Sequence, residues 1–244
     1  MRIFTFIVYI FLRVIFKVYF KIVGEPKFNK NITKTIRLYA ENDFTGWFKN
    51  IRFWDAPYSK VEKLIPDKGQ IVELGCGEGM FSNYLAISSS RRKVFGFDID
   101  RTRIKQADRG LKNTIFKKAD VTKLNLPQSD CIVMFHLLHH LLSPNLQTNL
   151  IKKSINSLKK DGKLIIVEIN NKPFFKYLVT WLTDHLLIAW LFEKRLYEPN
   201  IYFRSEKQWL KLFSEFDLKC KVYSVNRNMP FSHIIFECSK PQTK

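Results

Sequence analysis

The chain has 244 residues, of which 46% are hydrophobic and 26% are charged, and this composition excludes a disordered or fibrous protein. The length suffices for one α/β domain with a full hydrophobic core and small additions. The net charge of +19 predicts an anionic partner: nucleic acid, anionic lipid or an acidic substrate. A lysine-rich surface without a specific partner is the alternative, and composition alone does not decide between them.

The first 23 residues predict an amphipathic helix that anchors the protein to a membrane. Its polar residues recur every three or four positions and line one face: Arg2, Thr5, Tyr9, Arg13, Lys17 and Lys21. The other face is aliphatic and aromatic, which is typical of a helix lying in a membrane interface. No small-residue cleavage site follows, so a removable signal peptide is not expected. A tilted helix that spans the bilayer, and a helix packed on its own domain, remain open alternatives.

The rest of the chain predicts a helical cap over residues 24–60 and a main domain over residues 61–240. In the main domain, short β-rich runs alternate with helical runs, which predicts a doubly wound, mostly parallel α/β sheet of seven strands. The predicted strands are Gln70–Leu74, Lys93–Asp98, Thr114–Phe116, Cys131–Phe135, Lys163–Glu168, Leu218–Val225 and Phe231–Cys238. The predicted helices between them are Met80–Ile87, Arg101–Leu111, Pro144–Lys159 and, after a capping box at Ser205 and Gln208, a helix to Glu215. Asp161-Gly162 predicts a turn before the fifth strand.

A second apolar stretch, Phe174–Lys194, follows the fifth strand. We expect residues 174–204 to form a hydrophobic lid insertion, and a buried core helix is the alternative. The four cysteines show neither a CxxC pair nor regular spacing, so neither a zinc site nor a disulfide framework is expected. Cys76 and Cys131 are interpreted as small buried residues, which fits a reducing compartment.

The most specific pattern is the glycine loop Val72-Glu73-Leu74-Gly75-Cys76-Gly77-Glu78-Gly79, between the first strand and a helix. Gly75 and Gly77 allow a tight turn and a close approach to a ligand, and the helix N-terminus offers free N–H groups. The glycine positions fit neither the dinucleotide fingerprint GxGxxG nor a P-loop, which would end in GK[ST]. Asp98 ends the second strand about 20 residues later, where a carboxylate holds ribose hydroxyls in such sheets.

This set resembles class I S-adenosylmethionine (SAM)-dependent methyltransferases over roughly residues 60–240. The E-x-G-x-G-x-G loop is similar to motif I of that family, and Cys131–Leu141 is similar to its fourth strand and following turn. The resemblance implies that SAM is the cofactor and that residues 61–240 bind it. By position in the motifs it assigns these residues to SAM: Glu73, Gly75, Cys76, Gly77, Gly79, Asp98, Ile99, Asp120, Val121 and Phe135.

Methyl transfer requires alignment of donor and acceptor and, for a hydroxyl acceptor, a base. No His/Cys/Asp cluster predicts a metal site. His136, at the end of the fourth strand, is the predicted catalytic base or substrate contact, whereas His139 more often supports the fold in this family. Predicted substrate contacts are a polar and aromatic cluster in the cap, Arg52, Trp54, Asp55 and Tyr58, together with His140 in the turn. Tyr202 and Arg204 are also predicted contacts, in a stretch similar to "YRS" segments of methyltransferases for small or lipid-like molecules.

The sequence therefore predicts an enzyme that methylates an apolar or amphipathic, lipid-like or small-molecule acceptor at a membrane surface with anionic lipid, with the catalytic domain on the cytoplasmic side. A [DN]PP[YF] motif and a nucleic-acid-binding module are absent, which argues against nucleic acid as the partner. A methyltransferase of a soluble molecule or RNA, and a non-enzymatic membrane adaptor with this fold, are the alternatives. The acceptor atom and the oligomeric state are not predicted.

Overall fold

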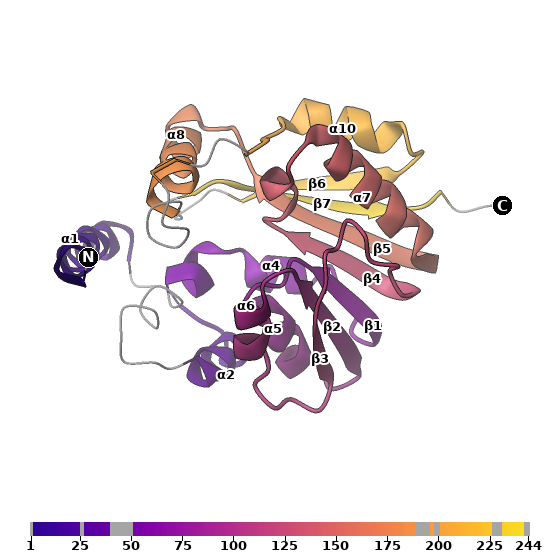
Figure 1. Ribbon diagram of the computed structural model, residues 1–244, viewed down its shortest axis with the longest axis horizontal. Helices are drawn as coiled ribbons and strands as arrows, with labels where there is room; N and C mark the ends of the chain where they lie inside the picture. The colour runs from indigo at the N-terminus through magenta and orange to yellow at the C-terminus, as the bar shows by residue number, and fades with distance from the viewer. Residues whose placement is uncertain are drawn as a thin grey trace.

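The computed structural model describes residues 2–24, 27–39, 51–188, 196–197, 201–225 and 231–241 (Figure 1). Within the first helix, side chains are described for residue 10 and residues 13–22.

A seven-stranded sheet with the order β3-β2-β1-β4-β5-β7-β6 forms the centre of the molecule. Its strands are β1 (Gly69–Leu74), β2 (Arg92–Asp98), β3 (Thr114–Lys118), β4 (Ser129–Phe135), β5 (Leu158–Ile169), β6 (Lys219–Val225) and β7 (His233–Ser239). Only β7 runs antiparallel to its neighbours, so the predicted mostly parallel sheet is confirmed.

Helices cover both faces of the sheet, and each face has its own core (Figure 1). Along β1, Ile71 packs with the core under α4 (Tyr58–Glu62) and α5 (Met80–Ser88), whereas Val72 packs with the core under α7 (Pro144–Asn156) and α10 (Glu206–Ser214). Both faces are therefore apolar, which explains the continuous hydrophobic runs of the strands. Other helices beside the sheet are α2 (Lys30–Leu38), α6 (Arg101–Ala107) and the short 3₁₀ helix η1 (Leu138–His140). The Ser205–Gln208 capping box at the start of α10 is confirmed.

Three predicted boundaries were wrong for local reasons. Helix α7 ends at Asn156 rather than at Lys159, because strand β5 already begins at Leu158. Helix α6 ends at Ala107, because Asp108 leaves it with extended backbone and its carboxylate accepts a hydrogen bond from the Gly110 amide (3.0 Å). Asp161 and Gly162 lie inside β5 rather than in a turn before it. There the ladder with β4 is irregular, since β4 advances from Ser129 to Cys131 while β5 advances from Leu158 to Lys163.

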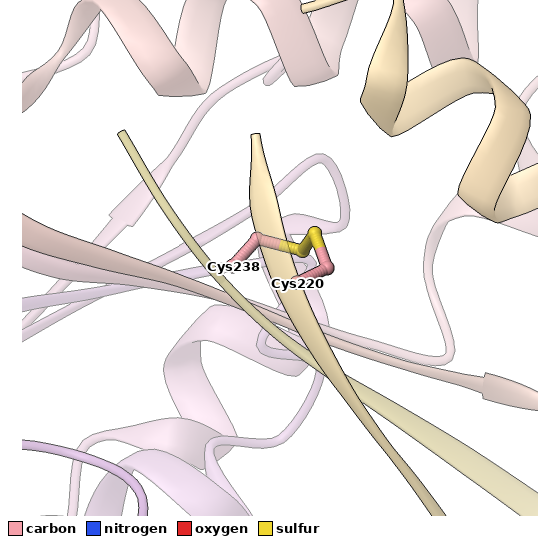
Figure 2. The surroundings of a disulfide bond; sticks show 2 residues. All are labelled: Cys220 and Cys238. Atoms are coloured by element: carbon pink, nitrogen blue, oxygen red, sulfur yellow. A yellow bond between two sulfur atoms is a disulfide. The ribbon is translucent and has the colours of Figure 1, made fainter. Parts of the chain in front are cut away.

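Cys220 and Cys238 form a disulfide between β6 and β7, which corrects the expectation that these cysteines would not pair (Figure 2). They lie directly opposite each other in the antiparallel register, with their Cα atoms 4.1 Å apart. This pairing is produced by the register of two strands, and cysteine spacing in the sequence does not reveal it. Cys76 and Cys131 are free and buried, as predicted.

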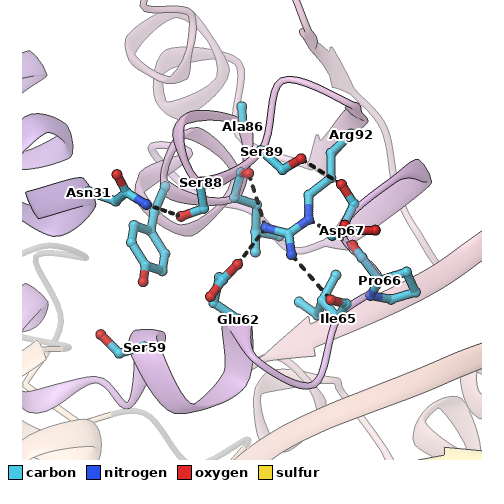
Figure 3. Close-up of polar contacts among 12 residues, drawn as sticks. Asn31, Ser59, Glu62, Ile65, Pro66, Asp67, Ala86, Ser88, Ser89 and Arg92 are labelled. Carbon is cyan, nitrogen blue, oxygen red and sulfur yellow. Dashed lines mark hydrogen bonds and ion pairs between the residues drawn. The ribbon is translucent and has the colours of Figure 1, made fainter. Parts of the chain in front are cut away.

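Buried Arg92 fastens the segment that precedes β1 to the sheet (Figure 3). Its guanidinium donates hydrogen bonds to the carbonyl oxygens of Pro66, Ile65 and Leu85 and forms an ion pair of 2.9 Å with Glu62. A buried charge with this many acceptors is compensated, and a shorter or less branched donor would leave carbonyl groups unpaired.

The N-terminal helix α1 (Arg2–Val23) packs on the main body through aromatic residues. Ring centroids of Phe16, Tyr19 and Phe20 lie 6.1, 5.5 and 4.8 Å from that of Trp54. Val14, Val18 and Ile22, four residues apart, lie on an exposed apolar stripe. Of the helices that the structure describes, none is both long and apolar enough to cross a membrane, so a spanning helix is not supported.

The apolar segment after β5 forms α8 (Phe174–Leu182), which continues as the π-helix η2 (Thr183–Ile188). Its outer stripe is exposed and consists of Phe174, Phe175, Leu178, Leu182 and Leu186, whereas Thr180 and His185 are buried. The described part is therefore not a core helix. Residues 189–195 and 198–200 of the predicted lid lie outside the described residues.

Candidate active site

The glycine loop lies at the carboxyl end of β1, where the structure gives it the conformation that the sequence predicts. Gly75, Gly77 and Gly79 all have positive φ angles (72°, 54° and 72°), and Gly79 is the N-cap residue directly before helix α5. The amides of Gly75 and Cys76 donate to the carbonyl oxygen of Phe97 at 2.8 and 3.0 Å, which fixes the loop against β2. A Cβ placed on Gly77 would meet no atom within 4 Å, so this side of the loop faces open space.

Asp98 joins this loop to the end of β2. Its Oδ2 accepts from the Gly77 amide (2.8 Å) and its Oδ1 from the Asp100 amide (2.9 Å). The next residue, Ile99, is 65% exposed, an unusual position for an aliphatic side chain unless it covers a ligand. The structure therefore brings together the glycine loop, Asp98 and Ile99, as predicted from their order in the sequence.

Four further residues assigned to the cofactor have different surroundings. Asp120 follows β3, and its carboxylate accepts from the Thr122 hydroxyl (2.6 Å), which is the main reason that its pKa is lowered. Val121 and Phe135 are buried, Phe135 against the rings of Tyr58 and Phe81. Cys76 is also buried, so its contribution to a ligand site would come from its backbone.

Glu73 is a buried carboxyl beneath the glycine loop. The Ser82 hydroxyl donates to its Oε2 at 2.5 Å. Burial raises the pKa of Glu73 from its usual 4.5 to about 8, although the Ser82 hydrogen bond and the Arg52 charge act in the opposite direction. The folded protein therefore keeps this carboxyl protonated at pH values where the unfolded chain would lose the proton.

The raised pKa of Glu73 predicts that the stability of the folded protein depends on pH, and Glu73→Gln should remove this dependence. Because the folded state binds the extra proton between pH 4.5 and about 8, Glu73 makes the protein less stable as pH rises through that range. In the absence of ligand, we expect the fall in Tm between pH 5 and 9 to be smaller in Glu73→Gln, by on the order of 5 °C. Thermal unfolding against pH measures it, with exposed Glu215→Gln as the control. Parallel curves for wild type and Glu73→Gln would contradict the assignment.

His136 directly follows β4 and has a left-handed backbone, with a φ of 51°. Its amide donates to the Val167 carbonyl (2.9 Å), and the next side chain, Leu137, lies against Gly75. His136 Nε2 is 3.0 Å from His233 Nδ1, and His233 Nε2 is 3.1 Å from Asp55 Oδ2. Burial holds the pKa of His136 well below its usual value, and the neighbouring His233 adds to this effect. The predicted base is therefore a neutral imidazole beside the glycine loop.

His139 supports the turn rather than facing open space. Its Nδ1 lies 2.5 Å from Glu168 Oε2, and the other oxygen of Glu168 accepts from the Leu138 amide (2.9 Å). Burial alone would lower the pKa of His139, but the Glu168 carboxylate more than offsets it, so the pKa is raised. His140 is exposed, with its ring centroid 4.1 Å from that of His139.

The remaining predicted substrate contacts divide into three environments. The Trp54 ring contacts aromatic side chains of helix α1, and Tyr58 is buried among aromatic rings. Arg52 is exposed, yet its charge acts on Tyr58, Glu73 and His136. Its role as a substrate contact remains a prediction.

Tyr202 and Arg204 are fastened to η1 and α7. The Tyr202 amide donates to the His139 carbonyl (2.8 Å), and Gln147 donates to the carbonyl groups of both Leu138 and Tyr202. Arg204 Nε donates to Gln147 Oε1 (2.6 Å). These bonds fix the backbone around η1, and a contact with substrate stays a prediction for both residues.

His233 and Asp55 complete the site. Asp55 was among the predicted substrate contacts of the cap, whereas His233 was not among the predicted site residues. Because β7 runs antiparallel to β5, its first residue lies opposite Ile169, at the edge where the parallel strands end. An antiparallel last strand therefore brings its beginning to the site, and that signal is available only once the strand order is known. Asp55 lies at the end of the helical residues 51–55 in the cap.

Together, the strand order, the glycine loop and the acid that ends β2 define a Rossmann-like protein that binds a nucleotide-type ligand at the carboxyl ends of its strands. The sequence model described as "Methyltransferase domain" matches residues 39–221. The chain therefore belongs to the methyltransferase domain family.

A curated methyltransferase is similar in sequence to part of the chain, and solved structures share its fold. A putative methyltransferase 235L of Invertebrate iridescent virus 6 is 29% identical over 130 residues, which is 53% of this chain and 46% of that protein. The match thus spans about half the length of the curated relative. The structure of the DhpI–SAH complex has a TM-score of 0.60 at 18% identity and covers 86% of this chain and 95% of its own. A SAM-dependent methyltransferase from Methanosarcina mazei has a TM-score of 0.59 at 19% identity, covering 76% and 99%.

Proposed function

We propose that this chain is a SAM-dependent methyltransferase that acts on an apolar or amphipathic, lipid-like acceptor at a membrane surface. The observation that carries the methyltransferase part is the hydrogen bond between Asp98 and the Gly77 amide, which joins the acid at the end of β2 to the glycine loop in a member of the methyltransferase domain family. Solved proteins of similar fold are complexes with SAH or SAM, which supports the same cofactor here.

The residues at the loop fit a SAM molecule. The open side of Gly77 offers room for a ligand against the backbone, Asp98 offers carboxylate oxygens for ribose hydroxyls, and exposed Ile99 offers an apolar cover for the base. When bound, SAM would supply a methyl group activated by its sulfonium. The protein would align the acceptor with it and keep water away, and His136, which directly follows β4, is the residue before Leu137, whose side chain lies against Gly75.

The membrane part of the proposal rests on the described half of α1. Val14, Val18 and Ile22 are 56%, 53% and 80% exposed, and exposed Arg13, Lys17 and Lys21 accompany them. Apolar and basic side chains together match the boundary between acyl chains and anionic headgroups. The exposed stripe of α8 adds a second apolar surface, over which a lipid-like acceptor would enter. Such basic residues favour the cytoplasmic leaflet, so we place the catalytic domain on that side.

A partition assay tests the proposed reaction. Full-length protein is incubated with methyl-labelled SAM and a total cell extract, beside Asp98→Ala, and the organic, aqueous and macromolecular fractions are separated. We expect label in the organic fraction that the variant lacks. Label in the aqueous or nucleic-acid fraction alone would instead establish a soluble or RNA acceptor. The absence of SAM binding would favour the non-enzymatic adaptor.

Removing the positive charges of α1 is expected to weaken binding to anionic vesicles. Each charge near an anionic surface contributes about 1 kcal/mol, so the triple variant Arg13→Gln/Lys17→Gln/Lys21→Gln should bind about 100-fold more weakly. Co-sedimentation with phosphatidylcholine vesicles, with and without phosphatidylserine, measures this. The control Lys207→Gln/Lys211→Gln/Lys219→Gln removes the same number of exposed charges from α10 and β6. Equal loss in both triple variants would show that net charge, and not α1, determines binding.

A further inference from the structure

Three titratable side chains from distant parts of the sequence form a hydrogen-bonded chain that ends at the predicted reaction centre. Asp55 comes from the cap, His233 is the first residue of β7, and His136 follows β4. The two contacts are 3.1 Å between Asp55 Oδ2 and His233 Nε2, and 3.0 Å between His233 Nδ1 and His136 Nε2. The imidazole planes of the two histidines differ by only 19°.

The direction of these hydrogen bonds follows from what each group can donate. Asp55 acts as an acceptor, since its other oxygen accepts from the Phe231 amide (3.4 Å). His233 therefore donates from Nε2, which leaves the lone pair of its Nδ1 to accept from His136 Nε2–H. His136 then carries its own lone pair on Nδ1, and this nitrogen has no hydrogen-bond partner within the described part of the chain.

The position of His136 is fixed, which is what a base requires. A left-handed φ is costly for a residue with a side chain, and the Val167 carbonyl and the contact of Leu137 with Gly75 hold the backbone there. The fold alone does not require the hydrogen bond between His233 and Asp55. An apolar side chain at position 233 could be buried at the start of β7 and would need no polar partner in the cap. His139 shows the contrast, since its Nδ1 is already engaged by Glu168.

Resting on the proposed function, we infer that the acceptor is a hydroxyl group, that His136 Nδ1 takes its proton, and that His233 and Asp55 are positioning residues that orient His136 and stabilise its charged form. The acceptor oxygen forms a bond to the methyl carbon, the carbon–sulfur bond breaks with its electron pair remaining on sulfur, and the hydroxyl proton moves to His136 Nδ1. A neutral amine attacks without prior loss of a proton and would not need such a chain. The methyl product is therefore an ether.

Two variants test the chain: Asp55→Asn and His233→Gln. With the organic extract as acceptor, we expect kcat to fall at least about 100-fold in Asp55→Asn, because the charged imidazole loses its counter-charge, while the Kd for SAM by calorimetry stays within about twofold of wild type. The matched control is Asp130→Asn, at the opposite end of β4, where the carboxylate accepts from the Gln70 amide and Lys159. The control should retain wild-type turnover.

Two readouts separate positioning from mere stability. The acidic limb of kcat/KM should shift to lower pH in Asp55→Asn, since the anion that favours the imidazolium is removed. The groups that face His136 are His233, His139, His140 and Arg52, and all are unchanged in this variant. Nitrogen NMR of the five histidines in wild type, without an acceptor, should show His136 neutral at pH 7.5, with a proton on Nε2 of both His136 and His233.

The outcomes distinguish the inference from the proposed function. Failure of wild type to bind SAM or to label any fraction would overturn the proposed function itself. If wild type labels a product, use of methyl-¹³C SAM reports the atom that receives the methyl group through its carbon chemical shift. An N-methyl or C-methyl product, or wild-type kcat and pH profile in both variants, would overturn the inference alone. If either variant unfolds, the histidine tautomers of wild type still test the inference. A proton on His136 Nδ1 would contradict the hydrogen-bonded chain from Asp55 through His233 to His136.

Discussion

Asp98→Ala is expected to lose SAM binding, with a Kd at least about 100-fold higher than that of wild type. Two effects act together. The Asp98 carboxylate holds the Gly77 amide and the Asp100 amide, so its removal leaves the glycine loop without its link to β2. It also removes the charged acceptor proposed for the ribose hydroxyls, and hydrogen bonds to a charged group contribute about 1.5–3 kcal/mol each. Calorimetric titration with SAM measures the change.

The control for this experiment is Asp161→Ala, an exposed aspartate at the irregular start of β5. It should leave the Kd unchanged. The far-ultraviolet circular dichroism of Asp98→Ala should match that of wild type, because the sheet does not depend on this carboxylate. Undiminished SAM binding by a folded Asp98→Ala would remove the main support for the cofactor site.

Gly79→Ala is expected to be among the most destabilising single substitutions in the chain. Gly79 has a φ of 72°, and a Cβ there would lie 2.7 Å from the Ala107 Cβ and 2.9 Å from the Phe116 ring. The left-handed conformation costs alanine roughly 1–2 kcal/mol, and overpacking adds typically about 1–3 kcal/mol. We expect the free energy of unfolding to fall by about 3–4 kcal/mol, as measured by urea denaturation.

Gly110→Ala separates the two causes. Gly110 has nearly the same φ, 73°, but a Cβ there would meet no atom within 4 Å. This variant should show only the conformational cost, about 1–2 kcal/mol. The difference between the two variants then measures the packing of α5 against α6 and β3. Equal losses would mean that the α5 N-terminus shifts to accept the methyl group.

The elements predicted best are those whose residues report on their own surroundings. The strands β1, β2 and β4 are apolar runs because both faces of the sheet are covered, and the glycine loop needs its glycines for positive φ angles at consecutive turns. The position of Asp98 at the end of β2 could also be predicted, because ligand-binding acids lie at the carboxyl ends of parallel strands. Each of these features depends on residue type and order along the chain, so the sequence is enough to predict it.

What the sequence did not reveal depends on pairs of residues far apart. Cys220 and Cys238 meet because β6 and β7 pair in one particular register. His233 reaches His136 because the last strand inserts between β5 and β6 and runs backwards. Asp55 was predicted as part of a polar and aromatic cluster in the cap, but its partner His233 could not be identified without the strand order. Glu168 is 2% exposed, and its role in holding His139 depends on the same packing.

The two edge strands of the sheet both carry exposed lysine residues, and this affects how readily copies of the protein aggregate. The outermost strands, β3 and β6, expose backbone groups that can pair with another molecule. Exposed Lys117 and Lys118 lie on β3, and exposed Lys219 and Lys221 lie on β6, which is also joined covalently to β7. Edge-to-edge approach of two molecules would therefore bring like charges together. Part of the large positive charge thus protects the protein from aggregation at high concentration.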